Sequence, residues 1–385
     1  MSDPFDPFAP GAMTDPYPSY ARLRDEEPVF RSDGYWIITR YADVLSSLRD
    51  HDHFSSEQGT GVDFESNPNL INIDPPDHTR LRRLVQRAFV PSRVAALEPV
   101  VEDLMDEMFT PLLGEPEVEL IGRFAAPLPV AVIARMMGVP RSHQGDFKRW
   151  ADLAMDGLAG RVDPSHRDTI EAGRKEMVSF FREVVSERRR RPDPGDDLVG
   201  VLLSASEEEV LSPAEVIAFC CLLLVAGSET TTNLMASTCL AVDMFPTEWT
   251  KAVDEPGLRG PFLEEMLRYD APVQAFFRTT SRPVNIAGVP IDAGEKVMLC
   301  FGSANRDPRK WVDPDRVRAE RRPTDHLAFG NGTHHCLGAA LARVEGNVFL
   351  RRLAESAQNV RVVSEPVRTA NPLLRGIHRM SVSLR

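Results

Sequence analysis

One cysteine in this chain stands in a setting suited to metal chemistry. In the stretch HLAFGNGTHHCLGAALARVE, a loop with Gly330 and Gly332 leads to Cys336, and a helix is expected to start near Leu337. Glycines let the backbone turn tightly and approach a flat object closely. The dipole and free amide groups of a helix N-terminus stabilise a cysteine thiolate. Cys336 is therefore a candidate metal ligand, and Gly338 keeps the first helical turn slim beneath a planar ligand.

Two other interpretations of this cysteine stand beside the first. A lone cysteine is more often a buried core residue. His334, His335 and Cys336 also suggest zinc, but neighbouring residues rarely supply a tetrahedral set, and no second cluster in the chain has ligand spacing. The glycine loop before Cys336 and the helix after it favour the metal-ligand interpretation over both.

A long apolar helix carries residues that such a helix does not need. The run LLLVAGSETTT places Gly227, Glu229 and Thr230 inside it. A glycine costs about 1 kcal/mol relative to alanine in a helix interior. Gly227 would let a ligand approach the backbone, and the Thr230 hydroxyl can hydrogen-bond the carbonyl of Ala226, which loosens the helix locally. The alternative is a surface stripe with a tolerated glycine.

A second helix offers two sets of cations. In IDPPDHTRLRRLVQRAF, apolar residues share one broad face at helical spacing, with His78 and Arg82 at its edge. The opposite side carries Arg80, Arg83 and Arg87. The alternative for any of these arginines is a solvated surface residue, an interpretation that we adopt for Arg93.

A third helix contains Glu265 and Arg268 in FLEEMLRYDAPV. Taken alone, this is an ordinary one-turn ion pair that contributes about 0.2–0.5 kcal/mol.

Together the four segments resemble the cytochrome P-450 superfamily, in that family's order. FGNGTHHCLG is similar to the family's cysteine loop at Phe329, Gly330, Gly332, His334, Cys336 and Gly338. The motifs span residues 74–338, and weaker resemblance runs from about Asp15 to the C-terminus. The resemblance implies a soluble bacterial-type enzyme with a mainly α fold and a small mixed β part. The haem would lie between the long helix containing Gly227 and the helix that follows Cys336.

The resemblance also implies roles for single residues. The cofactor would be haem b, iron protoporphyrin IX, with Cys336 as its axial ligand. Glu229 and Thr230 match the acid–alcohol pair that delivers protons during oxygen activation. The haem propionates would be held by His78, Arg82, Arg278 and His334. Further haem contacts would come from Ala226, Gly227, Phe329, Gly330 and Gly338.

Two further sets of residues follow from family position. Glu265 and Arg268 would form a buried structural triad with Arg316 of WVDPDRV, although Val317 stands where the family usually has an aromatic residue. The substrate pocket would be lined by apolar side chains, namely Leu223, Val273, Phe276, Phe277 and Leu373.

The function implied is that of a monooxygenase. It would insert one oxygen atom from O2 into a small-to-medium hydrophobic molecule, with hydroxylation as the default reaction. Because the sequence holds no flavin or iron–sulfur segment, electrons would come from a ferredoxin or flavodoxin with its NAD(P)H reductase. Such a partner would dock near Arg80, Arg83, Arg87 and Arg343. The alternatives are a peroxide-driven peroxygenase and a catalytically silent haem- or ligand-binding member.

The elements that must position these residues can be read from periodicity. Helical patterns cover 18–25, 77–89, 92–112, 121–137, 141–155, 165–190, 213–244, 259–269 and 337–355. A strand with a turn is expected at 29–39, followed by a helix from Tyr41. Further short strands are expected at 284–287, 296–301, 360–363 and 380–384. Residues 303–335 form a long Pro- and Arg-rich loop.

Composition limits the other possibilities. The 385 residues carry a net charge of −12, which argues against general nucleic-acid binding. Five cysteines are no disulfide framework, so a reducing cytoplasm is expected. The N-terminus lacks the pattern of a signal peptide, and the apolar stretch 220–226 is too short to span a bilayer. We expect one soluble domain over 1–385, with 1–14 extended or poorly ordered.

Overall fold

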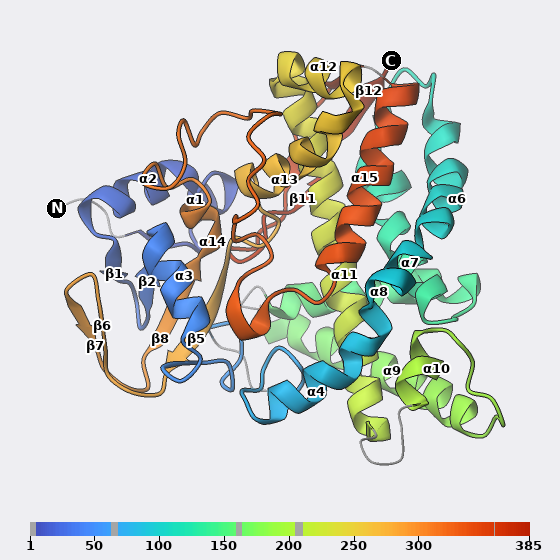
Figure 1. Ribbon diagram of the computed structural model, residues 1–385, viewed down its shortest axis with the longest axis horizontal. Coiled ribbons are helices and arrows are strands. Elements are labelled where there is room, and N and C mark those ends of the chain that lie inside the picture. The colour runs from blue at the N-terminus through green and yellow to red at the C-terminus, as the bar shows by residue number, and fades with distance from the viewer. Residues whose placement is uncertain (1–4, 63–67, 159–163, 205–210, 358) are drawn as a thin grey trace.

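The computed structural model describes residues 5–62, 68–158, 164–204, 211–357 and 359–385. These residues are mainly helical, with several small β-sheets, as expected (Figure 1). The helices are α1 (Pro10–Thr14), α2 (Tyr17–Glu26), α3 (Tyr41–Arg49), α4 (Asp77–Gln86), α5 (Pro91–Ala95), α6 (Glu98–Phe109), α7 (Pro127–Met136), α8 (Gln144–Leu158), α9 (Pro164–Arg189), α10 (Leu198–Leu203), α11 (Pro213–Met244), α12 (Pro246–Asp254), α13 (Arg259–Tyr269), α14 (Phe301–Ala304) and α15 (Ala339–Ser356).

The strands are short. They are β1 (Val29–Arg31), β2 (Trp36–Ile38), β3 (Phe54–Ser55), β4 (Val118–Glu119), β5 (Ala275–Thr280), β6 (Val284–Ile286), β7 (Val289–Ile291), β8 (Lys296–Cys300), β9 (Val360–Val362), β10 (Val367–Arg368), β11 (Ile377–Arg379) and β12 (Ser381–Leu384). The largest sheet has the order β1-β2-β8-β5-β3, in which only β2 and β8 run parallel. The sequence does not predict β5, because it is covered on both faces and lacks a polar–apolar alternation.

The N-terminal expectation is wrong for the part of it that the structure describes. Residues 10–14 form helix α1, and Phe5 is buried against Tyr20 with ring centroids 5.9 Å apart. Residues 1–4 lie outside the described residues. An apolar anchor at position 5 therefore ties this segment to α2.

Helix α11 runs through the middle of the molecule (Figure 1). It begins with a capping box, in which Ser212 and Glu215 satisfy each other's backbone N–H groups. By length and composition it is the one described helix that could cross a membrane. Residues 220–226, on which the sequence-based expectation rested, are only a small part of this helix. However, α11 packs against α7, α8, α9 and α15, and residues 231–239 are all buried. This is the environment of a core helix.

Gly227 also takes part in helix packing. A Cβ atom at this position would lie 2.8 Å from Cδ1 of Ile133 on α7. Contacts that short do not occur between real side chains, so the glycine allows α7 and α11 to approach closely. The missing side chain of Gly227 thus serves helix packing, and the expected approach of a ligand stays a prediction.

A buried ion network joins α13 to the long loop before Cys336. Arg268 Nε and Nη2 donate to Glu265 at 2.7 and 2.9 Å, and both side chains are fully buried. The third member is Arg321, whose Nε donates to Glu265 Oε1 at 2.9 Å. The prediction of Arg316 is wrong, because this exposed residue contributes only its backbone carbonyl, which accepts from Arg268 and Arg321. The network therefore fixes the loop through backbone and side chain together.

The two arginines make a matched test of this network. Arg321→Gln leaves a buried carboxylate short of one partner, and we expect the free energy of unfolding to fall by about 3 kcal/mol. Arg316→Gln, at an exposed position, should change it by less than about 0.5 kcal/mol. Urea unfolding of both variants provides the measurement. Equal losses would mean that the guanidinium of Arg321 is not the third member.

The contact between Gly227 and Ile133 can be tested by a double-mutant cycle. Gly227→Ala gains about 1 kcal/mol of helix propensity but crowds Cδ1 of Ile133, the atom that Ile133→Val removes. We expect Gly227→Ala to be more favourable by about 1 kcal/mol in the Ile133→Val background than in the wild type. Thermal or urea unfolding of the four proteins measures this coupling, and an identical effect in both backgrounds would contradict close packing.

Candidate functional site

Cys336 lies just before α15 and keeps an exposed side chain. Protein surrounds it on its other sides, and this burial raises the pKa of the thiol. The backbone N–H groups of Gly338 and Ala339, together with the guanidinium groups of Arg82 and Arg343, act in the opposite direction and favour the thiolate. The sulfur is thus held by the helix N-terminus with one face open, as expected for a ligand that binds an incoming metal.

The loop before Cys336 is shaped by two glycines. Gly330 and Gly332 have φ angles of +65° and +67°, which side-chain-bearing residues rarely adopt. A side chain at Gly332 would also collide with the backbone carbonyl of Leu48 on α3. The loop closes when the N–H of Cys336 donates to the carbonyl of Phe329 at 2.9 Å. These constraints fix the direction in which the sulfur points.

The structure brings the four expected propionate partners together. The rings of His78 and His334 lie 4.4 Å apart between centroids, and Arg82 and Arg278 are close enough to disfavour protonation of His334. Burial lowers the pKa of His78 to about 4 and that of Arg278 to about 10. Asp74, at 3.9 Å from His334 Nε2, is the carboxylate that balances this group. The cluster as a whole has a surplus of cationic side chains.

His78 provides the test of whether these residues fit a haem. Both of its ring nitrogens are buried, and neither has a hydrogen-bond partner in the part of the chain that the structure describes. Buried polar atoms normally have partners. An anionic group with several oxygen acceptors would satisfy His78 and neutralise Arg82 and Arg278. The two carboxylates of a haem meet this requirement, so the residues present fit the cofactor.

The sequence does not predict two members of this cluster. Ser56 Oγ lies 3.2 Å from His334 Nε2, and the backbone N–H of Ser56 donates to Asp74 at 3.0 Å. Asp74 stands next to the Pro75-Pro76 pair, inside the motif already recognised, and could have been found from that place. Ser56 comes from the irregular stretch after β3 and carries no sequence signal.

One face of α11 presents the expected catalytic pair. The hydroxyl of Thr230 donates to the carbonyl of Ala226 at 2.8 Å, as expected. Ala226 is exposed although this helix is otherwise a core element. Burial raises the pKa of Glu229, and Asn233 Nδ2 donates to its Oε1 at 3.4 Å. A carboxyl group whose pKa is raised holds its proton to a higher pH than an exposed one, which suits a role in proton transfer.

The expected pocket residues divide into two groups. Leu223, Val273 and Phe276 are partly exposed, which suits a pocket wall. Phe277 and Leu373 do not fit this role, because both are buried in a core cluster with Tyr35. Neighbouring residues of a strand point to opposite faces of the sheet, so Phe277 turns away from the face that Phe276 presents. Its ring instead packs edge-on against Tyr35, with centroids 5.2 Å apart.

The zinc interpretation receives no support from the described residues. No group of three or more His, Cys, Asp or Glu side chains in them could hold a metal ion. His334 turns instead to Ser56, while His335 packs against Phe329 with ring centroids 6.4 Å apart.

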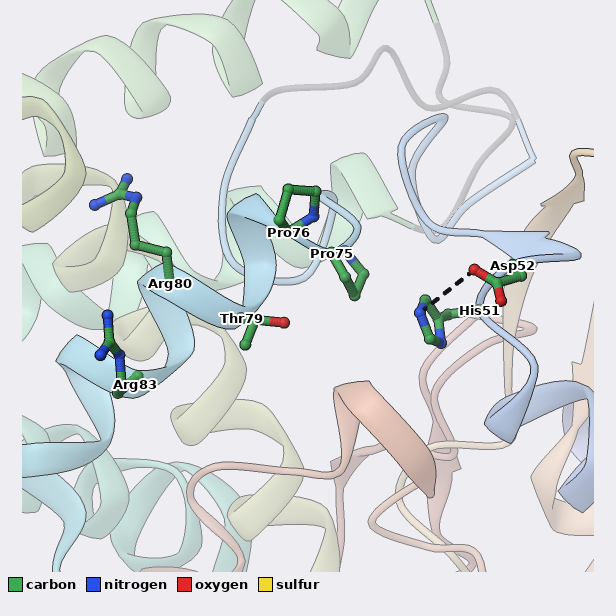
Figure 2. Close-up of a pocket in the computed structure, with 7 residues that line it drawn as sticks. All are labelled: His51, Asp52, Pro75, Pro76, Thr79, Arg80 and Arg83. Carbon is green, nitrogen blue, oxygen red and sulfur yellow. Dashed lines mark ion pairs between the residues drawn. The ribbon is translucent and has the colours of Figure 1, made fainter.

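The basic set on α4 borders an open groove. Figure 2 shows this groove of about 580 Å³, which is lined by His51, Asp52, Pro75, Pro76, Thr79, Arg80 and Arg83. Arg80 forms an ion pair with Glu215. Arg343 is paired with Glu264. Arg80 and Arg343 therefore already have carboxylate partners within the part of the chain that the structure describes.

Comparison with known proteins agrees with this site. The family model described as Cytochrome P450 matches residues 261–356. The chain is 38% identical to Cytochrome P450 107B1 of Saccharopolyspora erythraea, over 94% of this chain and 93% of that protein. It is 36% identical to Vitamin D(3) 25-hydroxylase of Pseudonocardia autotrophica, with 98% and 96% covered.

Solved structures give the same result. Cytochrome P450 CYP109Q5 from Chondromyces apiculatus superposes with a TM-score of 0.89 at 34% identity, and each chain is covered fully. CYP109E1 from Bacillus megaterium, in complex with corticosterone, superposes with a TM-score of 0.88 at 32% identity, with 97% of this chain and 99% of that chain covered. The fold, the haem cofactor and the monooxygenase activity implied by the four motifs are thereby confirmed. The chain belongs to the cytochrome P450 family.

Proposed function

We propose that Cys336 is the axial haem ligand of this monooxygenase, and that the enzyme hydroxylates a hydrophobic molecule of sterol size. The observation that carries the assignment is the exposed sulfur at the start of α15, beside a cluster of cationic side chains with unsatisfied His78 nitrogens. Haem bound in this way supplies the activation of molecular oxygen and the transfer of one oxygen atom. We further propose that the whole chain, 1–385, acts as one domain.

The chain's own residues would bind and orient the cofactor. His78, Arg82, Arg278 and His334 would neutralise the propionates, and Asp74 would hold His334 in place. On the opposite side, Ala226 would allow close approach to α11, since its exposed methyl group is the smallest side chain on that face of the helix. Phe329, Gly330 and Gly338 would flank the sulfur.

Glu229 and Thr230 would transfer protons to the site of oxygen activation. Because burial raises its pKa, Glu229 is protonated more easily than an exposed carboxyl group, which suits it to donate a proton. The Thr230 hydroxyl, which donates to Ala226 in this structure, would turn to pass a proton on and then be reprotonated through Glu229. Neither role is needed by an enzyme that receives oxygen as peroxide, and so the pair favours a dioxygen-using enzyme over a peroxygenase. It likewise favours an active enzyme over a catalytically silent member.

The pocket wall and the relatives agree on the substrate class. Leu223, Val273 and Phe276 offer an apolar, partly exposed surface. One relative is named a vitamin D(3) 25-hydroxylase, and CYP109E1 has been solved with corticosterone and with testosterone. A further relative is Cytochrome P450 monooxygenase PikC of Streptomyces venezuelae, at 34% identity. We therefore propose a sterol-like substrate with few polar groups.

The enzyme needs a redox partner, because this family receives its electrons from another protein or domain. We propose that an acidic ferredoxin or flavodoxin, in the cytoplasm, docks on the exposed side of α4, where Arg83 lines the groove of Figure 2 and the exposed Arg87 follows directly after the helix. Arg80 and Arg343 contribute less than expected, because Glu215 and Glu264 neutralise them.

Thr230→Ala tests the proton assignment. We expect haem and substrate to bind normally, while product formed per NAD(P)H consumed falls about tenfold or more, with hydrogen peroxide released instead. Thr230→Ser keeps the hydroxyl and should retain most of the coupling. Product, peroxide and NAD(P)H are measured together. Wild-type coupling in Thr230→Ala would remove Thr230 from the proton path.

Arg83→Glu tests the docking face. A reversed charge should slow ferredoxin-driven turnover about tenfold at low salt, with the difference shrinking as ionic strength rises. Arg93→Glu makes the same charge change on α5, at an exposed position outside the proposed face, and should have little effect. Unchanged steady-state turnover of Arg83→Glu across a ferredoxin titration would exclude this face.

A further inference from the structure

Behind the cysteine loop lies a charge network that the expected motifs do not include. Glu264 on α13 receives two hydrogen bonds from Arg343 on α15, at 2.7 Å from Nε and 2.9 Å from Nη2. The same carboxylate lies 3.0 Å from Nε2 of His326, whose side chain is almost fully buried. Although burial raises the pKa of Glu264, hydrogen bonds from His326 and Arg343 lower it to about 2. Glu264 is therefore an anion under all ordinary conditions.

This network contacts the loop that holds the sulfur. The guanidinium carbon of Arg343 lies 4.6 Å from the ring centre of Phe329, and the His326 ring lies 5.8 Å from the same ring. His326 Nδ1 accepts the backbone N–H of Ala328 at 3.2 Å. Phe329 in turn accepts the N–H of Cys336 through its carbonyl. Glu264 is thus connected to Cys336 in two steps. His326 and Arg343, which both hydrogen-bond Glu264, contact Phe329, and Phe329 hydrogen-bonds Cys336.

The bidentate geometry also fixes where the positive charge of Arg343 lies. Its guanidinium is one of two near Cys336, the other being that of Arg82. Only Arg343 has a carboxylate held against it by two hydrogen bonds, as far as the described residues show. A cation that is free and one that is paired exert different fields at the sulfur, because the carboxylate cancels much of the potential.

We propose that Glu264 is a positioning residue that holds Arg343 against Phe329 and sets the net charge experienced at Cys336. The inference depends on Cys336 being the haem ligand, as proposed above. Reduction of the ferric iron by one electron makes the centre more negative, so a nearby cation favours reduction and a nearby anion opposes it. The Glu264–Arg343 pair then keeps the ferric form more stable than an unpaired Arg343 would.

The test is the reduction potential of the purified holoenzyme, titrated with dithionite and mediator dyes. Glu264→Gln leaves Arg343 unpaired and should shift the potential in the positive direction, by up to about tenfold in the reduction equilibrium, which is about 59 mV for one electron. Arg343→Gln leaves Glu264 unpaired and should shift it in the negative direction. The double variant, in which both charges are removed, should return close to the wild-type potential.

A matched control is available on the surface. Arg141 and Glu107 form an exposed bidentate pair, in which Nη1 and Nη2 donate to the carboxylate at 2.7 and 2.8 Å. Glu107→Gln should leave the potential unchanged. Opposite shifts in the two single variants with recovery in the double variant would support the inference.

Other outcomes overturn the inference. A purely structural network would give single variants that lose stability without opposite shifts, and a double variant worse than either. Unchanged potentials in all three variants would also exclude it. If Glu264→Gln does not retain haem, the comparison of Arg343→Gln with the double variant still decides, because removing Glu264 in the Arg343→Gln background should reverse the negative shift. A wild-type protein whose reduced carbon monoxide complex lacks a thiolate spectrum would instead contradict the ligand assignment itself.

Discussion

The site depends on keeping one sulfur atom at the start of α15 fixed from behind and open in front. A thiolate is favoured there by the N–H groups of Gly338 and Ala339, but the loop that carries it has little regular structure of its own. Its rigidity comes from the buried Glu265–Arg268–Arg321 network. Buried ion pairs rarely add net stability, yet they are costly to break. Here the network adds little net stability, but it defines the position of the loop.

The charged side chains on the two sides of the sulfur differ in how far they are neutralised. On one side, the guanidinium groups of Arg82 and Arg278, beside the rings of His78 and His334, carry more positive charge than Asp74 balances, which prepares a site for an anionic cofactor. On the side behind Phe329, Arg343 is closely balanced by Glu264. A group of cations without enough carboxylates can bind an anionic cofactor, whereas a neutralised ion pair serves to hold a neighbouring side chain in place. The same residue type therefore serves two purposes within one site.

Much of this site could be predicted from sequence because its residues lie in short motifs on regular helices. The Thr230–Ala226 hydrogen bond follows from helical spacing alone. Predictions failed where position depends on tertiary packing. Arg316 and Arg321 lie in the same irregular loop, and no periodicity indicates which guanidinium reaches Glu265. Likewise, only the neighbouring helix shows that Gly227 faces Ile133, and only the sheet shows that Phe277 turns toward Tyr35.

The most direct test of the account is an absorption spectrum of the purified protein, reduced with dithionite and exposed to carbon monoxide. Its central claim is that Cys336 binds the haem iron as a thiolate. The account predicts a strongly red-shifted Soret band that is lost in Cys336→Ala. A band at the position usual for histidine-ligated haem, or a preparation unable to bind haem at all, would contradict it.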